Sequence, residues 1–374
     1  MLTYYNRYAR AGQVYADHNN FPVEFAIKCK NSCKIEFGGE RHLVPVKRLL
    51  ETHWQLAVEK VTAVGPVWRA ETVQGDFCLK RGKHGLGRLF FDYYAIEYLW
   101  KQGFTGTPRL IPTLYGNPVV ETEHGHFFLT AWVGRPLDAS SHAEWLTAAA
   151  TLGGFHHASK GLSFPPVAKP QNFSGKWARR FAERTEELQE FFASLSTSRN
   201  EFEEMINKDS AQILAQAAEA AQRLQASAYE RLARDVDVVP TLVHGNIKAE
   251  NFSVDQSGAV ALIDFDGFRL DVPVQDLANL FQDVLPACSW SPDAALEVFR
   301  AYQEQRPVDP EEIDVLLALL SFPHSAYKEI RKYITQPDRP LQKCLRKWQP
   351  ALQEMYQTRE FLQKWANPLK KCVQ

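Results

Sequence analysis

The chain has 374 residues, and its 43 lysines and arginines nearly balance its 44 aspartates and glutamates, leaving a formal net charge of −1. Such a balance lacks the positive excess of most nucleic-acid-binding and membrane-surface proteins, so we expect neither nucleic acid nor membrane as a partner. A hydrophobic content of 45% with 23% charged residues is ordinary for a globular protein and excludes a disordered chain. The length predicts two to three domains of roughly 150 residues each.

The cysteines and the apolar runs indicate a soluble protein of a reducing compartment. Only Cys29 and Cys33 of the six cysteines lie close together. No second pair completes a four-ligand zinc pattern, so we expect reduced thiols and no structural zinc. The opening residues, MLTYYNRYAR, lack the apolar core of a signal peptide. The longest apolar run, at 315–320, is far shorter than the roughly 20 residues that cross a bilayer. We therefore expect a cytoplasmic location.

The first third of the chain is predicted to be rich in strands. Apolar and polar residues alternate at 25–37, at 67–80 and at 119–132, and each run contains a turn signal near its middle. Each of these runs predicts a β-hairpin. Between the second and third hairpins, apolar residues at helical spacing predict a helix over 89–100, and Gly103 is placed where that helix could end.

Helices dominate after the third hairpin. Helical patterns occupy 144–159, a long stretch from about 177, and an apolar stripe over 214–232. Two short strand-like pieces at 241–243 and 260–263 interrupt them.

These elements divide the chain into three consecutive parts. Residues 1–50 form an extension that we expect to pack on the small lobe. Residues 51–133 form that small, sheet-bearing lobe, and residues 134–374 form a large helical lobe that carries two loops within 242–267. The predicted fold class is α+β.

Those two loops carry side-chain oxygens after short strands. The first reads His-Gly-Asn-Ile-Lys-Ala-Glu-Asn and ends at Asn251; the second reads Ile-Asp-Phe-Asp-Gly, and its Asp264 comes thirteen residues later. Two such loops side by side could hold Mg²⁺ between protein oxygens and phosphate oxygens, which this hard cation prefers. Phosphoryl transfer needs a cation clamp, a metal site and a residue that aligns the acceptor hydroxyl.

The loops resemble the catalytic and metal loops of the aminoglycoside-phosphotransferase branch of the protein-kinase-like superfamily. Within that branch the chain is similar to the spore coat protein S family of spore-forming bacteria. The similarity covers about residues 50–330, and the runs that carry it, besides the two loops, are 79–80, 103–109, 128–132, 155–159 and 264–278. It implies a bilobal protein-kinase-like fold, with a small antiparallel-sheet N-lobe and a large mainly helical C-lobe.

The resemblance implies a nucleotide site for ATP. Lys80 matches the strand lysine that contacts the nucleotide phosphates, and Glu97, on the following helix, is its expected ion-pair partner. An adenine would bond to backbone groups of the strand that leads into the hinge, at Thr130, Ala131, Trp132 and Val133.

The resemblance also assigns the residues of the two loops. Asn251 and Asp264 match the two Mg²⁺ ligands, while Asp266 either assists the metal or caps the turn. His244 is expected to pack and hydrogen-bond within its loop rather than move a proton. Asp276, at the start of a helix, matches the aspartate that holds the catalytic loop by accepting backbone N–H bonds.

Two further groups receive a structural interpretation. His156 and His157 are adjacent on a helix and point about 100° apart, which favours packing over a shared metal ion. In this fold the helical insert, here roughly 165–235, shapes the acceptor side. Its charged residues have no single sign, so we interpret them as a solvated helix surface; they are Arg179, Arg180, Glu183, Arg184, Glu186 and Glu187.

The chain departs from the family pattern at the catalytic position. The pattern has His-Gly-Asp, and this chain has Asn246. An amide can accept a hydrogen bond from the acceptor hydroxyl, but it is not a useful base and carries no negative charge. We expect the rate of phosphoryl transfer to be lower by a factor on the order of 10²–10⁴ than with an aspartate at this position. No Gly-x-Gly-x-x-Gly loop precedes Lys80 either, although related phosphotransferases often lack it.

Three interpretations stay open. The leading one is a pseudokinase that acts in spore coat assembly as a binding or structural component. The second is a working ATP- and Mg²⁺-dependent phosphotransferase that acts on a hydroxyl of a small molecule or a protein. The third is a kinase in which asparagine was substituted at 246. The resemblance implies a nucleotide and other spore coat proteins as partners, in the mother-cell cytoplasm or at the coat.

Overall fold

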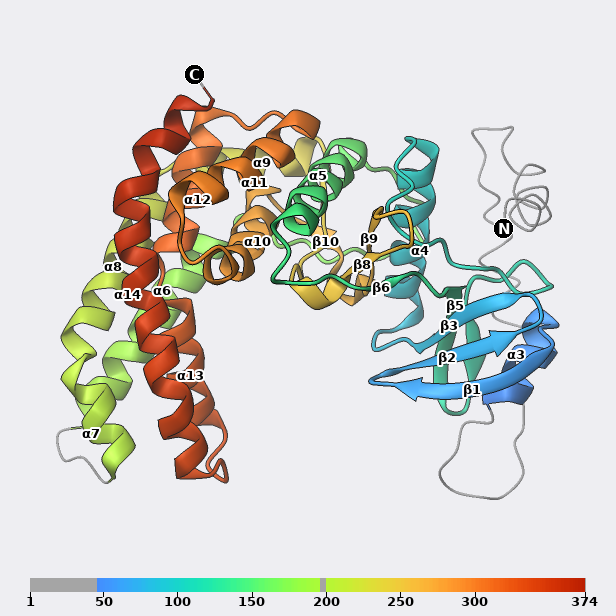
Figure 1. Cartoon of the computed structure of the whole chain (residues 1–374), viewed down its shortest axis with the longest axis horizontal. Helices are drawn as coiled ribbons and strands as arrows, with labels where there is room; N and C mark the ends of the chain where they lie inside the picture. The colour runs from blue at the N-terminus through green and yellow to red at the C-terminus, as the bar shows by residue number, and fades with distance from the viewer. Residues whose placement is uncertain (1–45, 196–199, 374) are drawn as a thin grey trace. The chain divides into compact units, whose positions relative to one another are not determined.

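The computed structural model of the chain describes residues 46–195 and 200–373 (Figure 1). The hairpin predicted at 25–37, and Cys29 with Cys33, lie outside the described residues. Two compact units emerge, and their segments interleave along the chain; the division predicted from the sequence stays a prediction. The first unit takes the described residues up to Phe90, with Ile111–Leu129 and Phe164–Lys169, and the second takes Phe91–Leu110, Thr130–Ser163 and the chain from Pro170.

The first unit is built on a five-stranded sheet in the order β1-β2-β3-β5-β4 (Figure 1). The strands are β1 (Val58–Val64), β2 (Val67–Thr72), β3 (Gly75–Arg81), β4 (Val120–Thr122) and β5 (Gly125–Ala131). The hairpins predicted at 67–80 and 119–132 are confirmed as β2–β3 and β4–β5, both antiparallel. Strand β1 was not predicted, because six of its seven residues are exposed or half-buried and its sequence shows no clean alternation.

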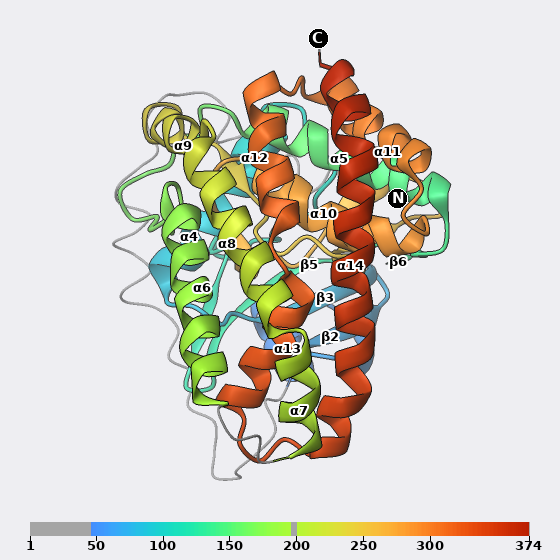
Figure 2. The ribbon, with the colours of Figure 1, turned by 90° about the vertical axis from the view of Figure 1, so that its left-hand side faces the viewer.

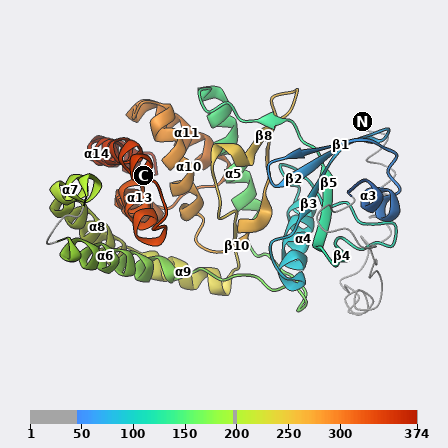
Figure 3. The ribbon, with the colours of Figure 1, turned by 90° about the horizontal axis from the view of Figure 1, so that it is seen from below.

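The core of the first unit lies between the sheet and helix α3 (Val46–Trp54) (Figure 3). Leu50 of the helix, Leu79 of β3 and Phe127 of β5 are completely buried. Trp54 also packs there, and its indole N–H donates a 2.8 Å hydrogen bond to the carbonyl of Ile111. The alternation of β3 thus places Phe77 and Leu79 on the core face of the sheet.

The second unit is mainly helical. In Figure 2 helices α6, α8, α13 and α14 run alongside one another, and α6 packs on α8 and α13 on α14. None of the helices at 46–195 or 200–373 is long and apolar enough to cross a membrane. Helix α4 (Leu86–Lys101) confirms the helix predicted at 89–100. The others are α5 (His142–Ser159), α6 (Lys176–Ser194), α7 (Glu201–Lys208), α8 (Ser210–Ala226), α9 (Tyr229–Val238), α10 (Val274–Ala287), α11 (Pro292–Gln305), α12 (Pro310–Ser321), α13 (His324–Thr335) and α14 (Leu341–Lys371).

Buried aromatic side chains join the helices of the second unit. Trp365 of α14 packs on Phe281 of α10, with ring centroids 5.0 Å apart. Trp348, in the first half of α14, packs edge-on against Phe202 of α7, with ring centroids 5.9 Å apart. All four rings are buried, so α14 closes the helical core along its length.

Two small sheets sit among these helices and carry the predicted loops. One has the order β6-β8-β9 and the other pairs β7 with β10. Their strands are β6 (Arg135–Pro136), β7 (Leu242–Val243), β8 (Phe252–Val254), β9 (Val260–Leu262) and β10 (Arg269–Leu270).

Truncating the core of the first unit tests this packing. Leu79→Ala removes a completely buried side chain, and we expect a loss of about 2–5 kcal/mol in the free energy of unfolding. Val73→Ala is the matched control, because Val73 is 74% exposed in the β2–β3 turn; its cost should stay within about 0.5 kcal/mol. Urea titrations of both variants measure the difference, and equal losses would contradict the assigned core.

Candidate functional site

Strand pairing brings the two predicted loops together. Phe252 of β8 lies opposite Leu262 of β9, and Val243 of β7 lies opposite Arg269 of β10. The first loop runs from the end of β7 to the start of β8, and the second from the end of β9 to the start of β10, so these two strand pairs hold the loops near each other at both ends. The backbone N–H of Ile263 donates a 2.9 Å bond to the carbonyl of Asn251, which joins the two loops directly.

Three of the predicted site residues meet at this junction. The side-chain N–H of Asn251 donates a 2.7 Å bond to the backbone carbonyl of Asn246. The side-chain amide of Asn246 in turn donates to an Asp264 carboxylate oxygen at 3.4 Å. Asp264 has a φ of 68°, a left-handed conformation that costs a non-glycine residue about 1–3 kcal/mol and is concentrated at functional sites. The fold therefore holds the Asp264 carboxylate at this junction in spite of local strain.

These side chains fit a hard cation. The side-chain nitrogen of Asn251 donates within the loop, so the side-chain oxygen is the atom of Asn251 that would bind a cation. Among the described residues no three His, Cys, Asp or Glu side chains gather into a metal-binding group. Mg²⁺ is typically held by one or two protein oxygens together with phosphate and water oxygens; Asn251 and Asp264 are the residues that would supply them. Asp266 lies in the short helix Phe265–Gly267 that follows Asp264.

A buried aspartate holds the first loop. The carboxylate of Asp276 is fully buried and accepts the backbone N–H of His244 at 2.5 Å and of Gly245 at 2.9 Å. Burial alone would raise the pKa of Asp276, but the hydrogen bond from His156 and the nearby Arg269 guanidinium hold that pKa below its usual value. Asp276 is thus ionised at neutral pH, and its charge strengthens both bonds to the loop.

His156 supports Asp276 from the other side. Its Nε2 lies 3.3 Å from the Asp276 carboxylate and its Nδ1 lies 2.8 Å from the hydroxyl of Tyr302. Burial lowers the pKa of His156 below 6.5, so the ring is neutral; Nε2–H donates to the carboxylate and Nδ1 accepts from the tyrosine. Arg306 extends this network: its Nη1 donates to the Tyr302 hydroxyl at 3.4 Å, and its Nη2 donates to the Glu312 carboxylate at 2.7 Å. The sequence predicted packing for His156 and did not reveal this contact, because Asp276 is 120 residues away.

Arg269 and His244 complete the support of the loop. Arg269 Nη1 donates a 3.0 Å bond to the carbonyl of Gly245, and its other donors bind Gln275 and Asp271. His244 is buried, and its Nε2–H donates to the carbonyl of Ile263 at 2.9 Å. His244 therefore ties the first loop to the second, as a packing and hydrogen-bonding residue would.

The predicted nucleotide residues are placed on their expected elements. Lys80 lies on β3 and is buried. Thr130 and Ala131 end β5, and Trp132 and Val133 follow it; the carbonyl of Val133 accepts a 2.6 Å bond from Ser253. Their contacts with adenine stay predictions.

Glu97 has a partner that the sequence analysis did not consider. Its carboxylate forms a bidentate ion pair with Arg109, whose Nε donates at 2.8 Å. The guanidinium of Arg109 also lies 5.5 Å from the centre of the Trp100 ring. The pairing of Glu97 with Lys80 stays a prediction.

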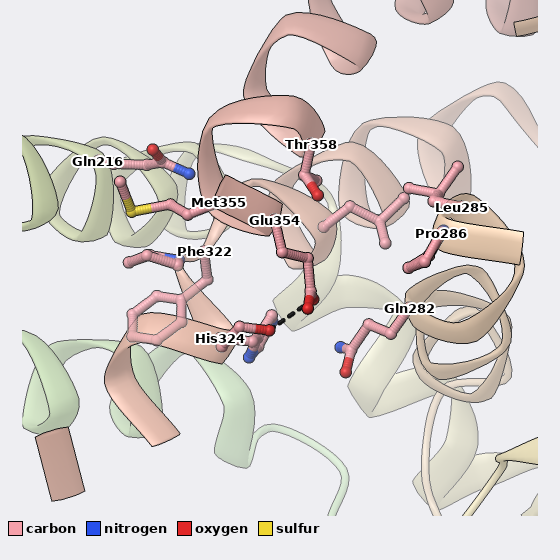
Figure 4. A pocket seen from close by; sticks show the side chains of 12 residues that line it. Gln216, Gln282, Leu285, Pro286, Phe322, His324, Glu354, Met355 and Thr358 are labelled. Atoms are coloured by element: carbon pink, nitrogen blue, oxygen red, sulfur yellow. Dashed lines mark hydrogen bonds between the residues drawn. The ribbon is translucent and has the colours of Figure 1, made fainter. Parts of the chain in front are cut away.

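A hollow between helices of the second unit contains none of the predicted site residues (Figure 4). Ser325 donates a 2.5 Å hydrogen bond to Glu354 there, and the Nε2 of His324 bonds to the Leu319 carbonyl at 2.9 Å. Burial lowers the pKa of His324 to about 4 and raises that of Glu354. These groups satisfy one another where helices meet, so we interpret the hollow as a packing junction. It is lined by Gln216, Gln282, Leu285, Pro286, Leu320, Phe322, Pro323, His324, Ser325, Glu354, Met355 and Thr358.

Comparison with solved structures defines the class. An aminoglycoside phosphotransferase from Alicyclobacillus acidocaldarius matches with a TM-score of 0.76 at 19% identity, covering 90% of this chain and 98% of that one. The AMP-bound spectinomycin phosphotransferase APH(9)-Ia matches with a TM-score of 0.59 at 15% identity, covering 83% and 97%. The chain therefore has the protein-kinase-like fold of the aminoglycoside phosphotransferases, and the predicted fold class is confirmed.

The family is more specific than the fold. Spore coat protein S of Bacillus subtilis (strain 168) is 26% identical over 265 residues, which cover 69% of this chain and 74% of that protein. A family model matches residues 47–365. The chain belongs to that family, described as "Spore coat putative kinase YutH".

The contact between Arg269 and Gly245 is testable with a single methyl group. A Cβ at Gly245, where φ is 75°, would lie 2.1 Å from Arg269 Nη1 and 2.3 Å from the Gly267 carbonyl. Gly258→Ala is the control, because its φ of 86° is equally left-handed while nothing lies within 4 Å. We expect Gly258→Ala to cost about 1–2 kcal/mol and Gly245→Ala about 1–3 kcal/mol more. Similar costs in urea unfolding would refute the tight loop.

The neutral His156 predicts a pH dependence of stability. Its pKa is lower in the folded protein than the ordinary 6.5, so the unfolded chain takes up its proton first as pH falls. The contribution of neutral His156 to the free energy of unfolding is complete above about pH 6.5. It is lost as the pH falls below that value, at up to about 1.4 kcal/mol per pH unit. His156→Gln should lose less stability than the wild type between pH 7 and pH 5, with the exposed neighbour His157→Gln as control. Equal losses in all three proteins would contradict the assignment.

Proposed function

We propose that this protein is a nucleotide-binding, kinase-like protein with an impaired phosphotransfer site, which acts in spore coat assembly as a binding or structural component. Its family and the name of its Bacillus subtilis relative support the link to the coat. We place it in the cytoplasm of the mother cell and at the forming coat.

The observation that carries the proposal is the orientation of Asn246. Its side-chain N–H, a donor, faces the Asp264 carboxylate at 3.4 Å. A carboxylate at 246 would be repelled by Asp264 at that distance unless a cation lay between them. The amide removes that repulsion, and it also removes the charged oxygen that would orient or deprotonate an acceptor hydroxyl. The loop is thus compatible with a bound nucleotide and ill suited to proton transfer.

ATP and Mg²⁺ are part of the proposal. Asn251 and Asp264 offer the oxygens described above, and a solved relative of the same fold binds AMP. Mg²⁺ would neutralise phosphate charge and bridge the nucleotide to the loops. Lys80 would contact the phosphates, and the backbone of 130–133 would bond to adenine.

A working phosphotransferase is the second candidate. The observation in its favour is the intact support of the loop by Asp276, His156 and Arg269, in which ionised and polar groups are buried at a considerable desolvation cost. In this case Asn246 would orient the acceptor hydroxyl through its amide oxygen. The transition state of phosphoryl transfer is loose, so the metal and positioning contribute more than the base does.

Nucleotide binding is tested by thermal melting. We expect the melting temperature to rise when ATP and Mg²⁺ are added at millimolar concentration, because a ligand that binds only the folded state stabilises it. Asp264→Asn should abolish the Mg²⁺-dependent part of the rise, and Asp338→Asn, an exposed aspartate in the turn before α14, should leave it unchanged. The absence of any shift in the wild type would refute both candidates.

Asn246→Asp separates the two candidates. For an impaired site we expect phosphate release from ATP to be very slow in the wild type and to rise about 10²–10⁴-fold in the variant. Efficient turnover by the wild type, unchanged in Asn246→Asp, would overturn the pseudokinase proposal in favour of a working enzyme.

A further inference from the structure

Helix α6 carries a row of positive charges on one face. Lys176, Arg180 and Arg184 follow one another at intervals of four residues, so they lie along the same side of the helix with steps of about 6 Å. The sequence mixes both signs in this segment, and we interpreted it as a solvated surface. In the structure Arg179 pairs with Glu183 at 3.1 Å, and the row is separate from that pair.

Aromatic rings hold the row in place. Lys176 and Arg180 lie over the ring of Phe173, at 4.7 and 4.6 Å from its centre. Arg180 lies 5.2 Å from the centre of the Trp177 ring, and Arg184 lies 5.1 Å from that of Tyr327. A guanidinium above a ring is attracted to the π face, while the N–H donors at its rim stay available for a carboxylate or phosphate.

The row lacks acidic partners within the described chain. Lys176, Arg180 and Arg184 form none of the ion pairs found among residues 46–195 and 200–373, although salt bridges are frequent elsewhere in α6, α8 and α13. The acids whose charges act on the two arginines have other partners. Tyr327 donates to Glu187 at 2.6 Å, Trp177 donates to Asp271 at 2.9 Å, and Glu183 pairs with Arg179.

The environment of the two arginines disfavours their charge. Burial, and then the neighbouring positive charge of Arg269, lower the pKa of Arg180. Burial lowers the pKa of Arg184 as well, and the charges of Arg180 and Arg331 add to the effect. A bound anion would oppose both effects, because it would add to the negative charge that Asp271 places near Arg180 and Glu187 near Arg184.

The row begins beside the loop that holds Asn246. The Phe173 ring that contacts Lys176 and Arg180 is also contacted by Arg269, at 4.8 Å. Arg269 donates to the carbonyl of Gly245, the residue before Asn246. Phe173 and Arg269 therefore connect the row to the first loop within the second unit.

We propose that Lys176, Arg180 and Arg184 form a binding site for an extended acidic polypeptide segment of a protein partner. Side chains on one side of an extended chain recur about every 6.6 Å, which matches the steps of the row. Phosphates along one strand of a DNA duplex recur about every 3.4 Å and match it less well. That the row on α6 lies on the acceptor side of the first loop rests on the proposed function. The binding of an acidic polypeptide to the row does not rest on it.

Fluorescence anisotropy with labelled peptides tests the site. The probes are an alternating Glu-Ala peptide and its Gln-Ala counterpart, titrated with the full chain without nucleotide at two salt concentrations. We expect the acidic peptide to bind and the neutral one not to bind, with affinity falling as salt rises. The variant R180Q/R184Q keeps side-chain length while it removes two charges, and it should weaken binding at least tenfold.

The matched control removes two arginines outside the row, Arg179 of α6 and Arg223 of the neighbouring helix α8. R179Q/R223Q loses partners of Glu183 and Glu219 and should bind within about twofold of the wild type. Lys176→Gln, whose side chain is exposed, should weaken binding about threefold and serves if the double variant does not fold.

Equal losses in both double variants, or no binding of the acidic peptide, would overturn the proposal. Tighter binding of single-stranded DNA or polyphosphate than of the peptide would also overturn it. The ATP-dependent melting shift is measured in the same proteins, so failure of this site and failure of nucleotide binding are distinguishable.

Discussion

The candidate site depends on one buried carboxylate. Asp276 accepts two consecutive backbone N–H groups of the loop after β7, and it keeps its charge because His156 donates to it inside the core. Removing a partner from such a buried pair leaves an uncompensated charge, which typically costs about 3–5 kcal/mol. The position of Asn246, and its contact with Asp264, follow from this anchor, since Asn246 directly follows the anchored residues.

Backbone strain and buried charges near the first loop cost free energy of folding, and hydrophobic packing alone does not explain why they are kept. Asp264 adopts a left-handed backbone conformation, and Arg269 and Asp271 are buried with their charges. Strain and buried charge persist where the rest of the fold over-determines them, and they are concentrated at sites of function. The impairment that we propose at Asn246, inside a loop that Asp276 supports, is consistent with a protein that binds rather than catalyses, and the row on α6 is the site that we propose for a protein partner.

Much of this could be predicted from the sequence. The β2–β3 and β4–β5 hairpins follow from alternation, and α4 from helical spacing; the juxtaposition of Asn251 and Asp264 follows from the resemblance of their loops. Strand β1 escaped prediction because most of its residues are exposed. The role of His156 escaped it because its partner Asp276 is 120 residues away. Arg109 lies only twelve residues after Glu97, but the turn of the chain after α4 that brings them together has no helical or strand spacing to reveal it.

What the sequence by itself determined was the chemistry available: oxygen ligands at two loops, an asparagine in place of an aspartate at 246, and a balanced overall charge. These are properties of residue type and order. Only the tertiary structure decided how charges are distributed. Arg179 pairs with Glu183 within α6, as their spacing of four residues allows. The packing of α6, in contrast, placed Arg180 over the Phe173 ring and Arg184 over the Tyr327 ring of α13, because only the folded chain decides which side chains of other segments meet a face of the helix.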